Sequence, residues 1–364
     1  MEFLFHYGLF IAKVLTVVVA IVAVVAIIAG MGMRKKHGPK GHIEITDLNE
    51  NYQSMYDSVE QAVLPEEQLK QLHKERKKQL KAEAKQEKSK AKSKKSSAEL
   101  SKEPSKEQPI TDKKRLFVLD FDGDIKASQV SGLKQSISAI LKIADSNDEV
   151  LVKLESGGGM VHGYGLAASQ LDRIKSKGIP LTIAVDKVAA SGGYMMACVA
   201  DKILAAPFAI IGSIGVVAQL PNFHRLLKKN DVDYEMLTAG EYKRTLTMFG
   251  ENTDKGRAKF LEDLELTHNL FKDFVGEHRP DLDVDAVATG EIWYGRQAID
   301  KGLIDEICTS DQYITDRLDS TRVIAVDYTF KKNVIDRISE AAESSVDRLA
   351  IKWVTRLLPT RPQV

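Results

Sequence analysis

Apolar residues between positions 114 and 328 fall into two alternating patterns. Short runs rich in Val, Ile, Leu and Phe, bounded by Gly, Pro and charged residues, predict buried strands at 116–121, 150–154, 180–185 and 203–206. The segments between them carry apolar residues at helical spacing, which predicts helices at 129–144, 160–176 and 192–200. Strands and helices that alternate at this interval predict an α/β fold with a parallel sheet built from repeated βαβ units.

The most apolar part of the chain lies near its N-terminus. Residues 14–33 carry no charge and consist mostly of Val, Ala and Ile. Twenty residues at ~1.5 Å each form a helix of about 30 Å, the thickness of the hydrocarbon core of a bilayer. A signal peptide would have a shorter apolar region and a small-residue cleavage site. We therefore expect a single uncleaved transmembrane helix that precedes the α/β fold.

Positive charges follow this predicted span. Arg34, Lys35, Lys36 and Lys40 come directly after it, whereas Lys13 is the only lysine or arginine before it. Because positively charged flanks favour the cytoplasmic side, this pattern places the rest of the chain in the cytoplasm.

A charged connector comes next. Residues 66–115 contain 17 Lys and Arg against nine Asp and Glu, a net charge of +8 in a chain whose total is +1. Residues 85–106 offer so little apolar surface that burial cannot offset their ordering entropy. One interpretation is a solvated linker, helical over about 48–87. The other is adhesion to anionic lipid headgroups.

The C-terminal segment, residues 333–358, has an apolar stripe at helical spacing. Its members are Ile335, Ile338, Ala342, Val346, Leu349, Trp353 and Leu357. The spacing predicts an amphipathic helix that packs on its own domain, on a partner subunit or on the membrane.

The composition excludes several classes of protein. With 364 residues, 43% apolar and 28% charged, the chain is neither disordered nor collagen-like as a whole. Cys198 and Cys308 form no CxxC pair, which excludes a disulfide scaffold, a zinc finger and a thioredoxin-type site. We expect no metal, no cofactor and no nucleic-acid partner.

Two glycine-rich turns each follow a predicted strand and precede a predicted helix. They are Ser156-Gly157-Gly158-Gly159 and Ser191-Gly192-Gly193. Glycine lets the backbone approach a ligand closely, and a helix N-terminus offers free N–H groups. A phosphate cradle and an oxyanion hole both use such groups, but neither GxxxxGK[ST] nor a GxGxxG after a strand is present. Tight strand-to-helix turns without a ligand are the simplest alternative.

Ser191 is the candidate nucleophile of the second turn. Its position between small residues resembles the nucleophile elbow of hydrolases, although GxSxG itself is absent, and an isolated serine there would more often cap the helix. A nucleophilic serine also needs a base. None of the nearby histidines has a glycine or small-residue context that suggests a pocket: His162, His224, His268 and His278.

Lysine can serve as the base if desolvation lowers its pKa. Lys243 follows a predicted strand at 234–237 and a turn at Gly240. Most lysines are solvated surface residues, so this position by itself is a weak signal.

Five motifs occur in order along the globular part. They are Ser156-Gly157-Gly158-Gly159, Ala190-Ser191-Gly192-Gly193-Tyr194, Ile211-Gly212-Ser213-Ile214-Gly215-Val216, Gly240-Glu241-Tyr242-Lys243 and Gly295-x-x-Ala298-x-x-x-Gly302-Leu303-Ile304-Asp305. Together they resemble the signal peptide peptidase A family of serine peptidases. The anchor, the basic connector and the single catalytic unit resemble its SohB-type branch.

The resemblance implies a ClpP/crotonase-like fold and a Ser–Lys dyad. Ser191 matches the nucleophile, Lys243 the general base and Ser213 the serine that orients the lysine. The backbone N–H groups of Gly158 and Gly192 match the oxyanion hole. The family usually has Pro where this chain has Gly157.

The resemblance also implies a setting for the reaction. Members assemble their dyads between repeated units or neighbouring subunits, so a chain with one unit is expected to form a ring of identical copies. Membrane-derived or unfolded apolar peptides, such as remnant signal peptides, are the expected substrates. The expected location is a bacterial inner membrane, and the family allows the periplasmic side against the cytoplasmic side that the charges favour. A crotonase-type acyl-CoA enzyme and a noncatalytic membrane scaffold remain alternative hypotheses.

The sequence thus predicts four parts. Residues 1–40 form a membrane anchor with a basic flank, and 41–113 form a charged helical or disordered connector. Residues 114–328 form the Ser–Lys peptidase domain, and 329–364 the C-terminal amphipathic helix.

Overall fold

The computed structural model describes residues 6, 13–16, 41–72, 74–76, 78 and 114–330. The chain divides into two compact units, Met1–His42 with Phe330–Val364 and Ile43–Thr329, and almost all described residues belong to the second. The predicted span at 14–33 lies mostly outside the described residues, and the predicted helix at 333–358 lies wholly outside them. No helix within the described ranges is both long enough and apolar enough to cross a bilayer.

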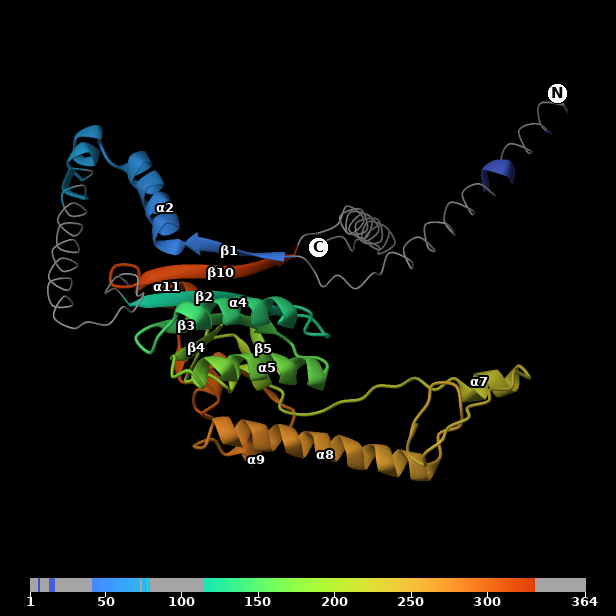
Figure 1. The fold of residues 1–364 in the computed structure, drawn as a ribbon. Coiled ribbons are helices and arrows are strands. Elements are labelled where there is room, and N and C mark those ends of the chain that lie inside the picture. The colour runs from blue at the N-terminus through green and yellow to red at the C-terminus, as the bar shows by residue number, and fades with distance from the viewer. Residues whose placement is uncertain are drawn as a thin grey trace, which may run out of the picture. The chain divides into compact units, whose positions relative to one another are not determined.

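In the described part of the chain, ten strands form one sheet, whose main path runs β1-β10-β2-β3-β4-β6-β9 (Figure 1). The strands on this path are β1 (Gly41–Asp47), β2 (Arg115–Gly123), β3 (Glu149–Ser156), β4 (Leu181–Val185), β6 (Lys202–Ala205), β9 (Glu306–Ile307) and β10 (Arg322–Phe330). From β10 to β9 every neighbouring pair is parallel. The predicted α/β fold with a parallel sheet is confirmed.

A short second branch leaves this path at the end of β3. There Ser156 pairs with β5 (Val188–Ala190), β5 pairs with β7 (Ile210–Gly212), and β7 pairs antiparallel with β8 (Ile292–Tyr294). Since β4 pairs only with earlier residues of β3, the sheet divides at this point. The division brings the carboxyl ends of β3, β5 and β7 side by side.

Successive side chains of each strand point to opposite faces of the sheet, and each face has its own apolar core. In β2, the face with Phe117 and Leu119 packs with the larger core, whereas Leu116 and Val118 belong to a smaller one. The larger core is covered by α4 (Val130–Ile143), α5 (Val161–Lys175), α6 (Gly192–Ala197) and the last turns of α8 (Asp254–His278). The smaller core is covered by α11 (Ser310–Thr315) and by the start of α2 (Leu48–Val63). Each fully buried Leu, Ile or Phe contributes about 1.5–3 kcal/mol through the area it removes from water.

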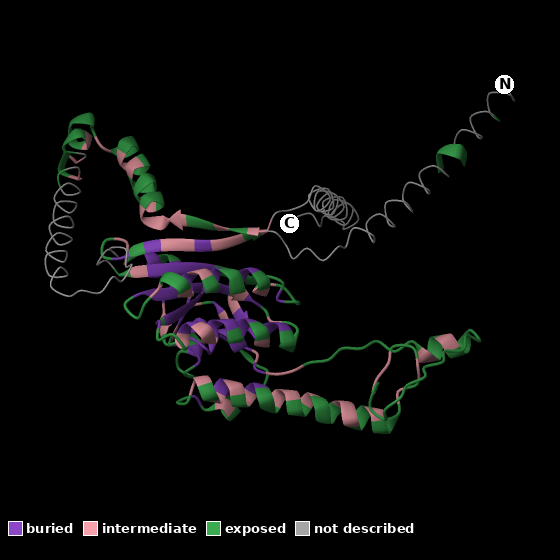
Figure 2. Cartoon of the chain, viewed as in Figure 1, coloured by how far each residue is buried: buried purple, intermediate pink, exposed green. Residues whose placement is uncertain are grey.

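Figure 2 shows that buried residues are concentrated in the sheet and in the helices beside it. Residues 217–250, which we call the arm, are mostly exposed and include α7 (His224–Lys229). The chain then returns to the core along α8, in which only Phe271 and Val275 are buried. The short elements α9 (Val284–Val287) and α10 (Gly295–Ala298) complete the second unit.

The four predicted strands and three predicted helices of the domain are all present, with shifts of a few residues at their ends. The strand predicted at 234–237 was wrong, because these residues have no regular structure and are exposed. Among the described residues, no strand pairs with them. The strands β1 and β10 and the long helix α8 were not predicted.

Candidate active site

Ser191 lies at the carboxyl edge of the sheet, between β5 and α6. Its backbone has φ 52° and ψ −119°, a conformation that a residue with a side chain rarely adopts. It occupies the N-cap position of α6, yet its side chain makes no capping hydrogen bond. The simpler interpretation of Ser191 as a helix cap therefore does not account for this residue. Its strained backbone is of the kind found where a side chain must be aimed at a ligand.

The first glycine turn lies directly against Ser191. Gly158 has φ 89°, and a Cβ atom added to it would come within 2.7 Å of the Ser191 Cβ and 2.8 Å of the Gly192 nitrogen. Only glycine permits this approach between the two turns. The structure thus brings together Ser191, Gly158 and Gly192, which the sequence predicted as nucleophile and oxyanion donors.

The Gly158 N–H already has an acceptor in this structure. It donates to the Ser156 Oγ over 3.0 Å. The Gly192 N–H is the first of α6, where the helix itself provides no acceptor. Of the two predicted oxyanion donors, the Gly158 N–H thus already has a hydrogen-bond acceptor, whereas the Gly192 N–H has none within its helix.

Ser213 lies on the neighbouring strand end. It follows β7 directly, is half-buried and has φ 51°, almost the value of Ser191. Its N–H donates to the Glu291 carbonyl over 2.6 Å, which ties it to the residue before β8. Because Ala190 and Gly212 are partners in the sheet, Ser191 and Ser213 stand at adjacent positions.

Lys243 lies in the arm and is exposed. The turn that carries it is held at the beginning of α8, where Glu241 pairs with Lys255 and the Tyr242 ring lies beside Lys255 and Lys259. From Lys255 to the buried Val275, α8 extends for about 30 Å. The opposite end of α8 packs against α6, which Ser191 precedes, and Figure 1 shows the arm reaching away from the sheet. A single chain therefore does not bring Lys243 to Ser191.

Lys187 is the lysine closest in sequence before Ser191, and it is a poor candidate for a base. Its Nζ lies 2.9 Å and 3.1 Å from the two oxygens of Glu155. A hydrogen bond and the negative charge of Glu155 raise the pKa of Lys187, so it keeps its proton more firmly than an ordinary lysine.

No hydrogen bond joins a histidine to Ser191 among the described residues. His278 lies between the Phe274 carbonyl and the Asp172 carboxylate, at 2.9 Å and 3.0 Å, and joins α8 to α5. His224 lies in the arm. Among the described residues, no three His, Cys, Asp or Glu side chains are grouped as metal ligands.

Sequence reasoning missed two residues that contact both glycine turns. Ser156 ends β3, and its Oγ lies 2.5 Å from the hydroxyl of Tyr164 on α5. The Tyr164 ring lies where a side chain on Gly192 would project. A serine directly before a glycine run was visible in the sequence, but the partner on α5 was not.

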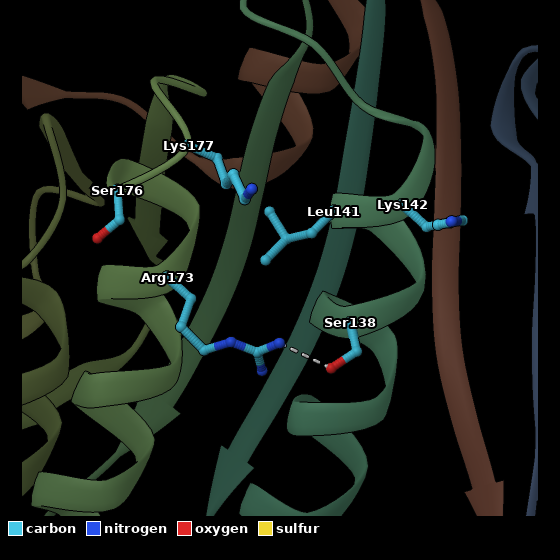
Figure 3. Close-up of a pocket in the computed structure, with 6 residues that line it drawn as sticks. All are labelled: Ser138, Leu141, Lys142, Arg173, Ser176 and Lys177. Atoms are coloured by element: carbon cyan, nitrogen blue, oxygen red, sulfur yellow. Dashed lines mark hydrogen bonds between the residues drawn. The ribbon is translucent and has the colours of Figure 1, made fainter.

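A pocket between α4 and α5 lies away from these groups (Figure 3). Its lining residues are Ser138, Leu141, Lys142, Arg173, Ser176 and Lys177, and Arg173 donates to the Ser138 Oγ over 2.9 Å. Most of them stand at the C-terminal ends of the two helices, next to the amino ends of the strands. The pocket is therefore at the opposite edge of the sheet from Ser191.

Comparisons with known proteins agree on one family. The family model described as "Peptidase family S49" matches residues 173–323, and "Peptidase family S49 N-terminal" matches residues 2–171. "Probable protease SohB" of Haemophilus influenzae is 50% identical over 352 residues, which cover 96% of this chain and 96% of that protein. "Probable protease SohB" of Buchnera aphidicola subsp. Schlechtendalia chinensis is 48% identical over 317 residues, 87% of this chain and all of that protein. "Protease 4" of Haemophilus influenzae is 25% identical over 64% of this chain and 40% of its own length.

Proposed function

The chain belongs to peptidase family S49, and on that basis we propose that it is a membrane-anchored serine endopeptidase with Ser191 as nucleophile and Lys243 as general base. The observation that carries the proposal is the backbone of Ser191. It is held at a positive φ, makes no capping bond, and lies against a glycine turn and a helix N-terminus. These are the features that a serine needs in order to attack a carbonyl beside an oxyanion hole.

The proposed reaction proceeds through an acyl-enzyme. The neutral amine of Lys243 takes the hydroxyl proton as Ser191 Oγ forms a bond to the peptide carbonyl carbon. The lysine then gives this proton to the leaving amine as the C–N bond breaks. Water, activated by the same lysine, attacks the ester and releases the second product.

The developing oxyanion is proposed to lie between the N–H groups of Gly158 and Gly192. The Gly158 proton would be shared between the oxyanion and Ser156 Oγ as a three-centre hydrogen bond. Removing one such donor typically lowers kcat by about 10²–10³. Ser213, at the adjacent strand end, is proposed to orient the amine of Lys243.

We propose that Lys243 reaches Ser191 from a neighbouring copy of the chain. Two observations support this arrangement. Lys243 is remote from α6 in its own chain, and the arm exposes several apolar side chains, Val217, Leu220, Phe223, Leu226 and Leu237. Leu237 is 92% exposed, and covering such a surface by a second copy would be favourable. The same contact would desolvate Lys243 and so favour the neutral amine that a general base needs.

Membrane attachment is proposed from the apolar residues 14–33. A peptidase held at the bilayer meets apolar peptides that come from the membrane, so such peptides, remnant signal peptides among them, are the proposed substrates.

Labelling with a fluorophosphonate probe tests the proposed nucleophile. We expect the full-length protein in mild detergent to be labelled at Ser191, and the Ser191→Ala variant to be neither labelled nor active on an apolar peptide. Ser169→Ala, which changes an exposed serine on α5, should behave as wild type. An unlabelled but folded wild-type protein would instead favour an acyl-CoA enzyme or a noncatalytic scaffold.

A second experiment tests the side of the membrane. We propose the cytoplasmic side, on the charges that follow residues 14–33. A cysteine placed in the connector at Ser97 should resist a membrane-impermeant maleimide in intact spheroplasts and react after lysis. Reaction without lysis would place the domain in the periplasm.

A further inference from the structure

A chain of hydrogen bonds runs from the first glycine turn into the interior of the domain. Gly158 N–H donates to Ser156 Oγ over 3.0 Å, Ser156 Oγ lies 2.5 Å from Tyr164 Oη, and Tyr164 Oη donates to the Asp124 carbonyl over 2.8 Å. Ser156 Oγ also lies 3.3 Å from the Gly123 carbonyl, so its single proton goes either to that carbonyl or to Tyr164. With either partner, a lone pair of Ser156 Oγ accepts from the Gly158 N–H.

Three glycines make room for this pair of side chains. A Cβ atom on Gly123 would come within 2.5 Å of both hydroxyl oxygens, and one on Gly193 within 2.5 Å of the Ser156 carbonyl. A Cβ atom on Gly192 would overlap the Tyr164 ring. Ser156 is 2% exposed and Tyr164 is fully buried. The backbone at two separate places, the end of β2 and the start of α6, is therefore fitted around two hydroxyl-bearing residues.

Tyr164 also connects the two halves of the proposed oxyanion hole. Through Ser156 its hydroxyl reaches the Gly158 N–H, and its ring supports Gly192, the residue that follows Ser191. We infer that Ser156 and Tyr164 are positioning residues that hold the two oxyanion donors at the correct distance from each other and from Ser191. The inference rests on the proposed function and adds to it two residues that do not touch the substrate.

Gly157 makes such support necessary. It has open space around it, and it lacks the φ restriction that a proline would impose on this turn. Ser156 supplies a hydrogen bond in place of that covalent restriction. A donor that is free to rotate stabilises a transition state poorly, because the enzyme must then order it at the moment of reaction.

The test measures kcat and KM of full-length Ser156→Ala in detergent on a fluorogenic apolar peptide that the wild type cleaves. We expect kcat to fall by roughly 10- to 100-fold, somewhat less than for loss of an oxyanion donor itself, with KM within about twofold of wild type. A peptidyl boronic acid, which forms a tetrahedral adduct with a serine, should lose affinity by the same factor as kcat/KM. Tyr164→Phe, which keeps the ring against Gly192 but loses the hydroxyl, should show a smaller loss of the same kind.

Thr182→Val is the matched control. Thr182 is also buried, and its hydroxyl is bonded to Glu149 at the opposite edge of the sheet. The Thr182→Val variant should have a lower melting temperature than wild type but the same kcat and the same affinity for the boronic acid. A folded Ser156→Ala protein with wild-type kcat, or an equal loss of kcat in Thr182→Val, overturns the inference. If the wild type itself neither cleaves the peptide nor binds the boronate, it is the proposed function that fails.

Discussion

The backbone N–H of Ser191 donates to the carbonyl of Gly212 over 2.8 Å, and this bond joins the turn of the nucleophile to the turn of Ser213. Both serines follow short parallel strands, and both have φ close to 50°. The same edge of the sheet thus bends two neighbouring strands in the same way. Two hydroxyl groups far apart in the sequence are placed at adjacent strand ends by one hydrogen bond and one strand pairing.

Replacing Ser191 by glycine should stabilise the protein while abolishing its activity. A residue with a side chain at φ 52° and ψ −119° costs about 1–3 kcal/mol, and glycine would relieve most of this at an entropic cost of about 0.4–1 kcal/mol. In urea unfolding, the free energy of unfolding of Ser191→Gly should therefore exceed that of Ser191→Ala by about 0.5–2 kcal/mol. Equal stability of the two inactive variants would show that the backbone of Ser191 is not strained.

Two neighbouring glycines should respond differently to alanine. Gly158→Ala would force a side chain into a left-handed conformation and against Ser191. We therefore expect the variant to lose its activity and to lose about 1–3 kcal/mol of its free energy of unfolding. A Cβ atom on Gly157 would project into open space. Gly157→Ala should therefore keep its activity, and its free energy of unfolding should rise by about 0.4–1 kcal/mol. Peptide hydrolysis and urea unfolding measure both effects. Similar behaviour of the two variants would refute the close approach of this turn to Ser191.

Lys243→Arg should be nearly as inactive as Lys243→Ala. A guanidinium group keeps its proton at every accessible pH, so it cannot accept one from a serine. The measurement is kcat on an apolar peptide, with Lys228→Arg, which changes another lysine of the arm, as control. Appreciable turnover by Lys243→Arg would assign the base to another residue, and His224 would be the next candidate.

Mixing two inactive variants tests whether the dyad forms between copies. Chains with Ser191→Ala keep Lys243, and chains with Lys243→Ala keep Ser191. If each site takes its serine and lysine from adjacent chains, random co-assembly should restore about a quarter of wild-type activity. Mixtures that stay as inactive as their components after dissociation and reassembly would place the dyad within one chain.

Tyr313→Phe should weaken the fold in a manner that depends on pH. Burial alone would raise the pKa of Glu149, but hydrogen bonds from Tyr313, Lys114 and Thr182 outweigh it and hold that pKa below its usual value. Burial and the bond to Glu149 raise the pKa of Tyr313 to about 12, so the tyrosine remains a donor at neutral pH. A carboxyl with a lowered folded pKa stabilises the fold above its unfolded pKa of ~4.3, and this stabilisation is lost as pH falls through the folded value.

The variant removes the strongest donor and therefore raises the pKa of Glu149. We expect the free energy of unfolding of Tyr313→Phe to be lower than that of wild type by about 1.5–3 kcal/mol near pH 7. Acid destabilisation should begin at a higher pH than in wild type. Urea unfolding between about pH 3 and pH 7 measures both effects. Tyr234→Phe, which changes an exposed tyrosine, is the control. A difference from wild type that does not shrink at low pH would contradict the role of Glu149.

The sequence predicted the centre of the sheet because both faces of its strands are buried. Residues 116–121 and 150–154 are therefore nearly continuous apolar runs, and the helices between them carry clear periodic stripes. The same reasoning failed at 234–237, where apolar residues are exposed in the arm. An apolar run shows that a segment needs a partner, but it does not show whether that partner is in the same chain.

For the candidate site, the sequence by itself determined the residue types: two glycine turns, a serine between small residues, and the motif that marks Lys243. Only the tertiary structure decided which of them meet. Ser156 pairs with Ala189, and Ala190 with Gly212, so Ser191, Ser213 and Gly158 come together at one edge, whereas α8 keeps Lys243 apart. The support of Gly158 by Ser156 and Tyr164 was likewise invisible in the sequence. The physical reason is that periodicity records how each segment is buried, whereas strand pairing and side-chain contact depend on which distant segments pack together.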